Sequence, residues 1–277
     1  MQNTIEQMTE YRGSGLHTGK DCVIRLLPAK PGAGVVFRRV DLPGKPEVPA
    51  TVDFFEESPV MCSGVIHENG ARVRLIEHIM ACLHAMKIDN ILIEMDLEEP
   101  PFEDGSAEYF LNLLKKAGIK QQDAPEKLIK LHEPVLYRED GVEITAFPSS
   151  SFRVTFFAEY PHPLVGSQSF SLEVTPESFT REVARAQTFC FEHDVQAMKK
   201  HGLLLGATEE SSLVYGKEGL INGRARYPDE PVRHKVLDLI GDLYLLGAQL
   251  SAHVTARKSG HRTHARFVKK IRKECGL

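Results

Sequence analysis

The sequence predicts an α+β protein made of two similar two-layer domains that face each other, each with helices packed on a sheet. The 277-residue chain is long for one compact core, and its 42% hydrophobic content is typical of a folded protein. Each half ends in the same succession of helix, strand, loop and helix, which suggests a duplication. A short polar segment at 121–126 separates the halves, so we expect domains at 1–126 and 127–277.

In the first half, a glycine-rich turn at 12–20 precedes the first predicted strands, and a Pro-rich segment at 42–49 interrupts the regular pattern. The predicted strands are apolar runs bounded by turn residues, at 22–27, 35–38, 60–66, 71–75 and 90–95. The third and fourth form a hairpin, because Glu68-Asn69-Gly70 is a turn signal. Helices are expected at 74–86 and 106–117, the second beginning at Ser106 as its cap.

In the second half, the same reasoning predicts strands at 127–137, 142–147, 152–160, 167–174 and 252–256. A helix over 176–185 begins at Pro176, which is favoured at the first helical position, with Thr175 as its cap. Two more helices are expected, one over about 231–246 and one that begins at His261.

The composition indicates a cytoplasmic protein. Residues 1–15 lack the apolar stretch of a secretory signal, and the most apolar run, 236–250, is interrupted by Asp238 and Asp242, so no transmembrane segment is expected. The cysteines are odd in number and scattered, which argues against a disulfide framework; they are Cys22, Cys62, Cys82, Cys190 and Cys275.

The net charge of −4 hides a basic C-terminal segment. Its cations are Arg257, Lys258, Arg262, Arg266, Lys269, Lys270, Arg272 and Lys273. A solvated helix face is one interpretation, and contact with phosphate, either on a nucleotide-linked substrate or on an anionic membrane surface, is the other. Nucleic acid is not an expected partner, because the chain is acidic overall and lacks interleaved aromatic residues.

Three polar residues recur four apart on the apolar helix predicted at 231–246. His234, Asp238 and Asp242 therefore lie along one helix face. An isolated His-x3-Asp is more often an ordinary surface pattern than a metal site. The prediction of a metal site therefore requires further ligands elsewhere in the sequence.

A second helix pattern supplies that context, because Glu77 and His78 together interrupt its apolar face. His78, His234 and Asp238 make a two-histidine, one-carboxylate set, which is common for catalytic zinc with water in the fourth position. Glu77 is then free to act as a base. The chain has neither a Cys-x2-Cys pair nor a His-Glu-x-x-His helix, so a zinc finger and a thermolysin-like protease are both excluded.

These motifs, taken together, resemble one family. They are Gly15-Leu16-His17-Thr18-Gly19-Lys20, Glu77-His78, Asp104-Gly105-Ser106, Ala186-Gln187-Thr188-Phe189, His234-Lys235-x-x-Asp238-x-x-Gly241-Asp242 and Lys258-Ser259-Gly260-His261. The pattern runs nearly from end to end and is similar to that of the bacterial zinc-dependent UDP-3-O-acyl-N-acetylglucosamine deacetylases. The resemblance implies release of acetate from that substrate, the committed step of lipid A biosynthesis in Gram-negative bacteria.

The resemblance also implies roles for individual residues. By this resemblance, one zinc ion is held by His78, His234 and Asp238, Glu77 is the general base, and His261 is the companion acid or an electrostatic stabiliser. Thr188 helps to hold the oxyanion, and from the charge that develops there we expect Lys235 to be aimed at it too. Asp242 would keep His261 charged, because a nearby carboxylate raises a histidine pKa.

Substrate contacts are expected from the remaining motifs. Lys258 is assigned to the diphosphate. The resemblance implies that each domain carries an insert and that the second, at about 189–214, receives the acyl chain. Its passage is assigned to Phe189, Phe191 and Met198, with Cys62 as a wall residue near the active site. Two positions depart from the pattern, because His264 stands where many members carry an amide and Cys190 where glycine is common.

Two other functions remain open at this point. One is a non-catalytic nucleotide-sugar-binding protein in which zinc only holds the domains together. The other is a zinc deacetylase of a different acetamido sugar. Three protein ligands leave the fourth position of zinc to water, and Glu77 beside them could act as a base. Both features argue against a purely structural metal. We expect a monomer, with a peripheral membrane contact of the basic segment as an open alternative.

Overall fold

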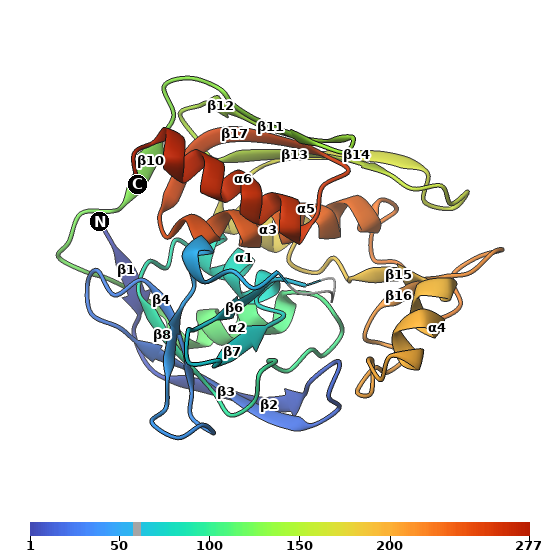
Figure 1. Ribbon diagram of the computed structural model, residues 1–277, viewed down its shortest axis with the longest axis horizontal. Helices are drawn as coiled ribbons and strands as arrows, with labels where there is room; N and C mark the ends of the chain where they lie inside the picture. Colours follow the sequence, from blue (N-terminus) through green and yellow to red (C-terminus); the bar gives the residue numbers. More distant parts are fainter. Residues whose placement is uncertain (58–61) are drawn as a thin grey trace.

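The computed structural model describes residues 1–57 and 62–277, and it confirms the predicted α+β class (Figure 1). The first large sheet has the strand order β2 (Thr9–Ser14), β3 (Asp21–Pro28), β8 (Ile91–Met95), β4 (Val35–Arg39) and β5 (Glu47–Pro49). The second has the order β11 (Val135–Glu139), β12 (Val142–Pro148), β17 (Gln249–Arg257), β13 (Arg153–Glu159) and β14 (Ser167–Glu173).

The two sheets have the same topology. In each, neighbouring strands run antiparallel except for one pair at the same place in the order, β4 with β8 and β13 with β17. A short extra strand, β10 (Leu128–Lys130), pairs in parallel with the start of β17. This repetition agrees with the succession of elements that the sequence repeats between its halves.

The helices of the two halves meet in the middle of the molecule. Figure 1 shows α1 (Glu77–Ala85) and α2 (Glu108–Ala117) on the side of the first sheet. It shows α3 (Pro176–Glu182), α5 (Glu230–Leu243) and α6 (His261–Glu274) beneath the second sheet. The apolar faces of both groups belong to one continuous core, with Ile79 and Leu83 of α1 and Leu237 and Ile240 of α5 fully buried. The ends of α1 and α5 are thereby brought together.

Smaller elements flank this core. The ends of the first half pair as β1 (Asn3–Ile5) with β9 (Ile119–Gln121), and β6 (Gly64–Ile66) and β7 (Arg72–Arg74) form the expected hairpin. The described residues also form two 3-10 helices, η1 (Val52–Phe54) and η2 (Tyr244–Leu246). In the second half, β15 (Phe189–Phe191), α4 (Glu192–Lys200) and β16 (Leu213–Tyr215) make a parallel βαβ unit, which lies to one side of the sheets in Figure 1.

Several predicted boundaries shift. The helix expected from Ser106 begins at Glu108, because the Ser106 hydroxyl accepts from the Glu108 amide while it donates to Asp104. The strand expected over 127–137 is divided into β10 and β11, the helix at 74–86 shortens to α1, and the helix at 176–185 ends at 182. Residues 60 and 61 of the expected hairpin lie outside the described part of the chain.

Within the described residues, no helix has the length and apolar character needed to cross a bilayer. The five cysteines are all free thiols, as their scattered positions predict. Burial raises the pKa of Cys22 to about 12.

Candidate active site

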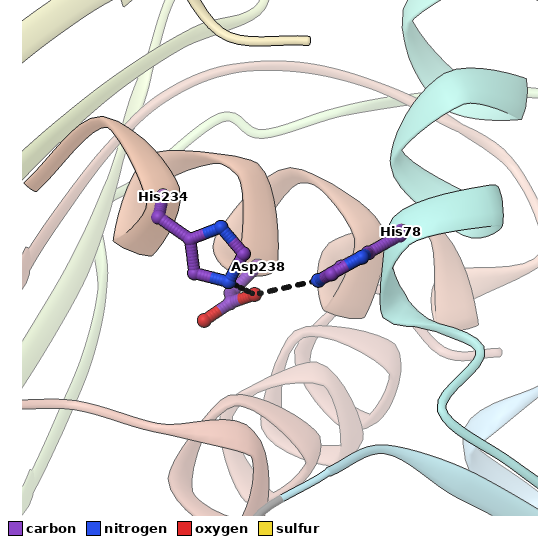
Figure 2. Close-up of side chains that lie close together, drawn as sticks. All are labelled: His78, His234 and Asp238. Carbon is purple, nitrogen blue, oxygen red and sulfur yellow. Dashed lines mark ion pairs between the residues drawn. The ribbon is translucent and has the colours of Figure 1, made fainter. Parts of the chain in front are cut away.

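Two helices from opposite halves of the chain bring the predicted metal ligands together. Figure 2 shows His234 and Asp238 on one side of α5 and His78 extending toward them from the start of α1. Oδ1 of Asp238 lies 3.3 Å from Nε2 of His234 and 3.9 Å from Nε2 of His78. The two imidazole rings meet nearly edge to face, with centroids 5.0 Å apart. All three side chains are buried, so their free ligand atoms share a space that excludes most of the solvent.

The hydrogen bonds around this cluster leave its metal-facing atoms free. Nδ1 of His234 donates to the carbonyl of Ala186 at 3.0 Å, which directs Nε2 toward the cluster. Oδ2 of Asp238 accepts from Nζ of Lys235 at 2.7 Å, whereas Oδ1 is buried and has no hydrogen-bond partner among the residues that the structure describes. A buried carboxylate oxygen without a partner is costly unless a cation binds it. The donor set therefore fits a zinc ion.

Electrostatics keep the ligands in the forms that bind a metal. Burial, assisted by the neighbouring imidazole of His234, lowers the pKa of His78 to about 3, so its ring stays neutral. Burial alone would raise the pKa of Asp238, but the charge of Lys235 and the nearby histidines outweigh it and hold that pKa well below its usual value. A neutral imidazole and an ionised carboxylate are the ligand forms required.

Glu77, the first residue of α1, lies beside this cluster. Its side chain is 4% exposed, and Oε2 accepts a hydrogen bond of 3.0 Å from the backbone amide of Ser63. Burial raises the pKa of Glu77 to about 7, although the charge of His261 works in the opposite direction. A carboxylate with a pKa near neutrality can accept and return a proton at physiological pH.

His261 begins α6 and forms an ion pair with Asp242 of α5. Nδ1 of His261 lies 2.8 Å from Oδ2 of Asp242. Burial would lower the pKa of His261, but the Asp242 carboxylate overrides it and raises the pKa to about 9. The imidazole is therefore a cation at neutral pH, and Nε2 remains as a proton donor toward the cavity that His261 lines.

Asp242 has two further partners that the motifs did not reveal. Oδ2 also accepts from Nδ1 of His264 at 2.6 Å, and Oδ1 accepts from the hydroxyl of Ser63. Nε2 of His264 lies 2.8 Å from Oγ of Ser259. Neither contact is predicted from the sequence, because no local pattern links Asp242 to Ser63 or to His264.

One cavity of about 1130 Å³ connects these groups to the βαβ unit. The predicted site residues that line it are Cys62, Glu77, His78, Thr188, Phe189, Phe191, Met198, His234, Lys235, Asp238, Lys258 and His261. Its apolar end is formed by aromatic rings, with Tyr160 lying 5.3 Å from Phe189 and 5.6 Å from Phe191 between centroids. The cavity is thus polar at the candidate metal cluster and aromatic where β15 borders it.

Thr188 is fixed at the junction between the two regions. Its amide donates to the carbonyl of Gly105 at 2.8 Å, and its own carbonyl accepts from Leu213 at 2.9 Å. Gly105 has a φ of +71°, and a Cβ there would lie 2.8 Å from the Thr188 methyl. The Asp104-Gly105-Ser106 motif therefore places Thr188 at the cavity.

The same βαβ unit is attached to the first half. The amides of Leu205 and Gly206 donate to the carbonyls of His17 and Leu16, at 3.2 and 3.0 Å. Glu99 holds this loop from behind, because its carboxylate accepts from the amides of His17 and Thr18. The Gly15 to Lys20 motif is thus a docking loop that completes one wall of the cavity.

The basic C-terminal segment is partly used within the protein. Arg266 pairs with Glu139 and, at 3.4 Å, with Glu57, and Arg272 pairs with Asp53. Lys258 lines the cavity while its Nζ lies 2.9 Å from Glu159. The segment is therefore not one free cationic patch, because Arg266 and Arg272 join α6 to acidic residues of both halves.

Comparisons with known proteins agree on one relationship. The family model described as UDP-3-O-acyl N-acetylglycosamine deacetylase matches residues 2–273. Three curated proteins named UDP-3-O-acyl-N-acetylglucosamine deacetylase are similar to the chain, each over 98% of its length. The protein from Myxococcus xanthus is 36% identical over 86% of its own length, and that from Thermodesulfovibrio yellowstonii 38% over 91%. The protein from an Anaeromyxobacter species is 40% identical over 88%.

Proposed function

This chain belongs to the family of UDP-3-O-acyl-N-acetylglucosamine deacetylases, and we propose that it releases acetate from that substrate with one zinc ion held by His78, His234 and Asp238. The chain is accordingly a hydrolase of an amide bond, acting in lipid A biosynthesis. The observation that carries the ligand assignment is Oδ1 of Asp238, which has no partner in the described part of the chain and lies near two neutral imidazoles.

A bound zinc ion would act as a Lewis acid and make water a nucleophile near neutral pH. Glu77 is the general base, because its burial raises its pKa to about 7 and it lines the same cavity as the ligands. A site in which zinc only held the two halves together would need no such base.

The leaving nitrogen of the glucosamine must gain a proton, and we assign that transfer to His261. Its Nδ1 is bound to Asp242, so only Nε2 can be presented to substrate. The Thr188 hydroxyl and the Lys235 ammonium are the donors assigned to the oxyanion of the tetrahedral intermediate. Lys235 is already oriented by its 2.7 Å contact with Asp238.

We assign the two ends of the substrate to the two ends of the cavity. The acyl chain would lie against Phe189, Phe191 and Met198, which line its apolar part, with Cys62 in the wall. The diphosphate is assigned to Lys258, and Glu159 holds that ammonium at the rim. We also propose that the enzyme acts as a monomer, because the whole candidate site comes from one chain. A cytoplasmic location is supported by the five free thiols.

Acetate release from UDP-3-O-acyl-N-acetylglucosamine tests the proposal. The wild-type protein should release acetate from this substrate, lose that activity when a chelator is added, and regain it when Zn²⁺ is restored. Glu77→Ala and His261→Ala should retain zinc but lose most of their turnover. Zinc-loaded wild type that binds substrate without releasing acetate would contradict the enzyme assignment. Equal turnover of a substrate without the acyl chain would instead favour a deacetylase of another acetamido sugar.

A further inference from the structure

Ser63 lies between the two groups to which proton transfer is assigned. It is fully buried, at the start of the β6–β7 hairpin of the first half. Its backbone amide donates to Oε2 of Glu77 at 3.0 Å. Its hydroxyl donates to Oδ1 of Asp242, which is the carboxylate that pairs with His261.

We propose that Ser63 is a positioning residue that ties the base Glu77 to the Asp242–His261 pair. This inference rests on the proposed function, because it assigns Ser63 a part in that reaction. Ser63 itself has no reacting atom to offer, since its amide and its hydroxyl proton are both used within the protein.

The direction of each hydrogen bond follows from charge. The side chain of Asp242 is an ionised carboxylate that can only accept, so the Ser63 hydroxyl must donate to it. Oγ of Ser63 then has lone pairs facing Nδ1 of His261, which lies 3.2 Å away and whose main partner is Asp242. The Nδ1 proton is thereby shared between Asp242 and Ser63, which fixes the ring orientation and leaves Nε2 directed away from both.

The contacts of Asp242 also show why Ser63 differs from His264. Oδ2 accepts from His261 and His264, two residues of α6 that are one turn apart, and so ties α5 to α6 within the second half. Oδ1 accepts from Ser63, which belongs to the first half. Ser63 is therefore the partner of Asp242 that also contacts Glu77, and it sets the acid and the base relative to each other.

The energetic consequence is specific to the hydroxyl. Ser63→Ala would remove the donor to Asp242 and leave that carboxylate oxygen buried without a partner, while the amide contact with Glu77 is kept. Asp242 and His261 would then be less well held, whereas the metal ligands and the apolar passage would be unaffected. The loss should appear in kcat rather than in KM.

Three variants and one control test this role. Ser63→Ala should lower kcat about tenfold with little change in KM, which corresponds to the loss of one buried hydrogen bond. Ser63→Cys keeps the shape with only a weak donor and should resemble Ser63→Ala. Ser63→Thr keeps a hydroxyl and should regain most of the activity. The control is Ser251→Ala, because Ser251 is a buried serine of β17 whose hydroxyl donates to Ser149 at 2.8 Å, away from the cavity.

A double-mutant cycle separates positioning from general stability. If Ser63 acts through Asp242 and His261, Ser63→Ala should lower kcat by less than about twofold when His261 is already replaced by alanine. The inference would be overturned if Ser63→Ala lowered kcat as much in the His261→Ala protein as in the wild type. It would also be overturned if Ser251→Ala lowered kcat as much as Ser63→Ala does. Zinc content and thermal midpoint are measured for every variant. If the wild type releases no acetate, the proposed function fails. If the wild type releases acetate and Ser63→Ala does so at the same rate, only the role of Ser63 is contradicted.

Discussion

Gly241 of α5 packs directly on the carbonyl group of Glu77, the first residue of α1. A Cβ at position 241 would overlap the Glu77 oxygen and would lie 2.9 Å from its carbonyl carbon and 3.1 Å from the amide nitrogen of Ala81. Only glycine allows the two helices to approach so closely. This crossing holds the base and one predicted ligand of α1 next to the other two ligands on α5.

Gly241→Ala should therefore separate the two helices and damage the metal site. Overpacking of this kind typically costs about 1–3 kcal/mol of folding free energy. We expect a lower thermal midpoint and weaker zinc binding, measured by calorimetry and metal analysis. Gly219→Ala is the control, because a Cβ there would have no described atom within 4 Å. Normal zinc affinity in Gly241→Ala would show that the crossing has no influence on the site.

Gly206→Ala should impair the acyl passage selectively. A Cβ on Gly206 would overlap the carbonyl oxygen of Gly15 and lie 2.8 Å from Cα of Gly19, so the βαβ unit would have to move away from its docking loop. We expect KM to rise for long-chain substrates and to change little for a substrate without the acyl chain. The measurement is steady-state kinetics with both substrates, and again Gly219→Ala serves for comparison. An equal effect on both substrates would argue that the junction does not shape the passage.

Metal removal should destabilise the protein. Zinc binds the folded state, and a ligand at a hundred times its Kd adds about 2.7 kcal/mol of stability, which corresponds to several degrees in Tm. The chelated wild type should melt at lower temperature and recover with Zn²⁺. Asp238→Ala should show no such response, because one ligand is missing. A Tm that does not depend on zinc in the wild type would refute the ligand assignment.

Asp242→Asn should shift the alkaline limb of the pH–activity profile. His261 has to be protonated to act as an acid, and its pKa of about 9 depends on the Asp242 carboxylate. Activity of the wild type should fall as pH rises through about 9. In Asp242→Asn the pKa of His261 should be lower, so the fall should begin at lower pH. An alkaline limb at the same pH in both proteins would assign that limb to another group.

His84 should make stability depend on pH in the acidic range. Its ring is buried between Phe152 and Tyr244, at 4.5 and 4.6 Å, and Nδ1 donates to the carbonyl of Ile240. Burial lowers the pKa of His84 from its ordinary value of 6.5 to about 4, so the unfolded chain binds more protons between these two pH values. Stability should then fall as pH decreases from 6.5 toward 4, by up to about 3 kcal/mol.

Denaturant unfolding at pH 7 and pH 4.5 measures this dependence. His84→Gln keeps a donor for Ile240 but does not titrate, so its stability should vary less with pH than that of the wild type. His193→Gln is the control, since the side chain of His193 is 80% exposed. The same pH dependence in His84→Gln and wild type would mean that other groups are responsible.

Local periodicity made much of the fold predictable. The four-residue spacing of His234, Asp238 and Asp242 fixes them on one helix face whatever surrounds the helix. The helix at His261 and the helix that begins at Pro176 were likewise predicted from local signals, and both are present. Boundaries were less accurate, as at Ser106, whose hydroxyl accepts from the Glu108 amide while the regular helix begins only at Glu108.

Contacts between distant segments depended on the tertiary structure. The ligand set was predicted from the sequence and the family resemblance together, but the sequence contains no local signal that joins Ser63 or His264 to Asp242, or Arg272 to Asp53. Such pairs form only when the helices and sheets pack. At the crossing of α1 and α5, that packing depends on the absence of a side chain at Gly241.

The sequence by itself determined which residues could do chemistry and on which face of each helix they lie, because hydrogen bonding within a helix sets that periodicity. Only the tertiary structure decided which of these faces meet. The packing around α5 leaves one oxygen of Asp238 without a partner among the described residues, and it gives Asp242 donors from Ser63 of the first half and from His261 and His264 of α6. Two carboxylates one turn apart on one helix therefore have different environments, because burial removes the water that would otherwise make them alike.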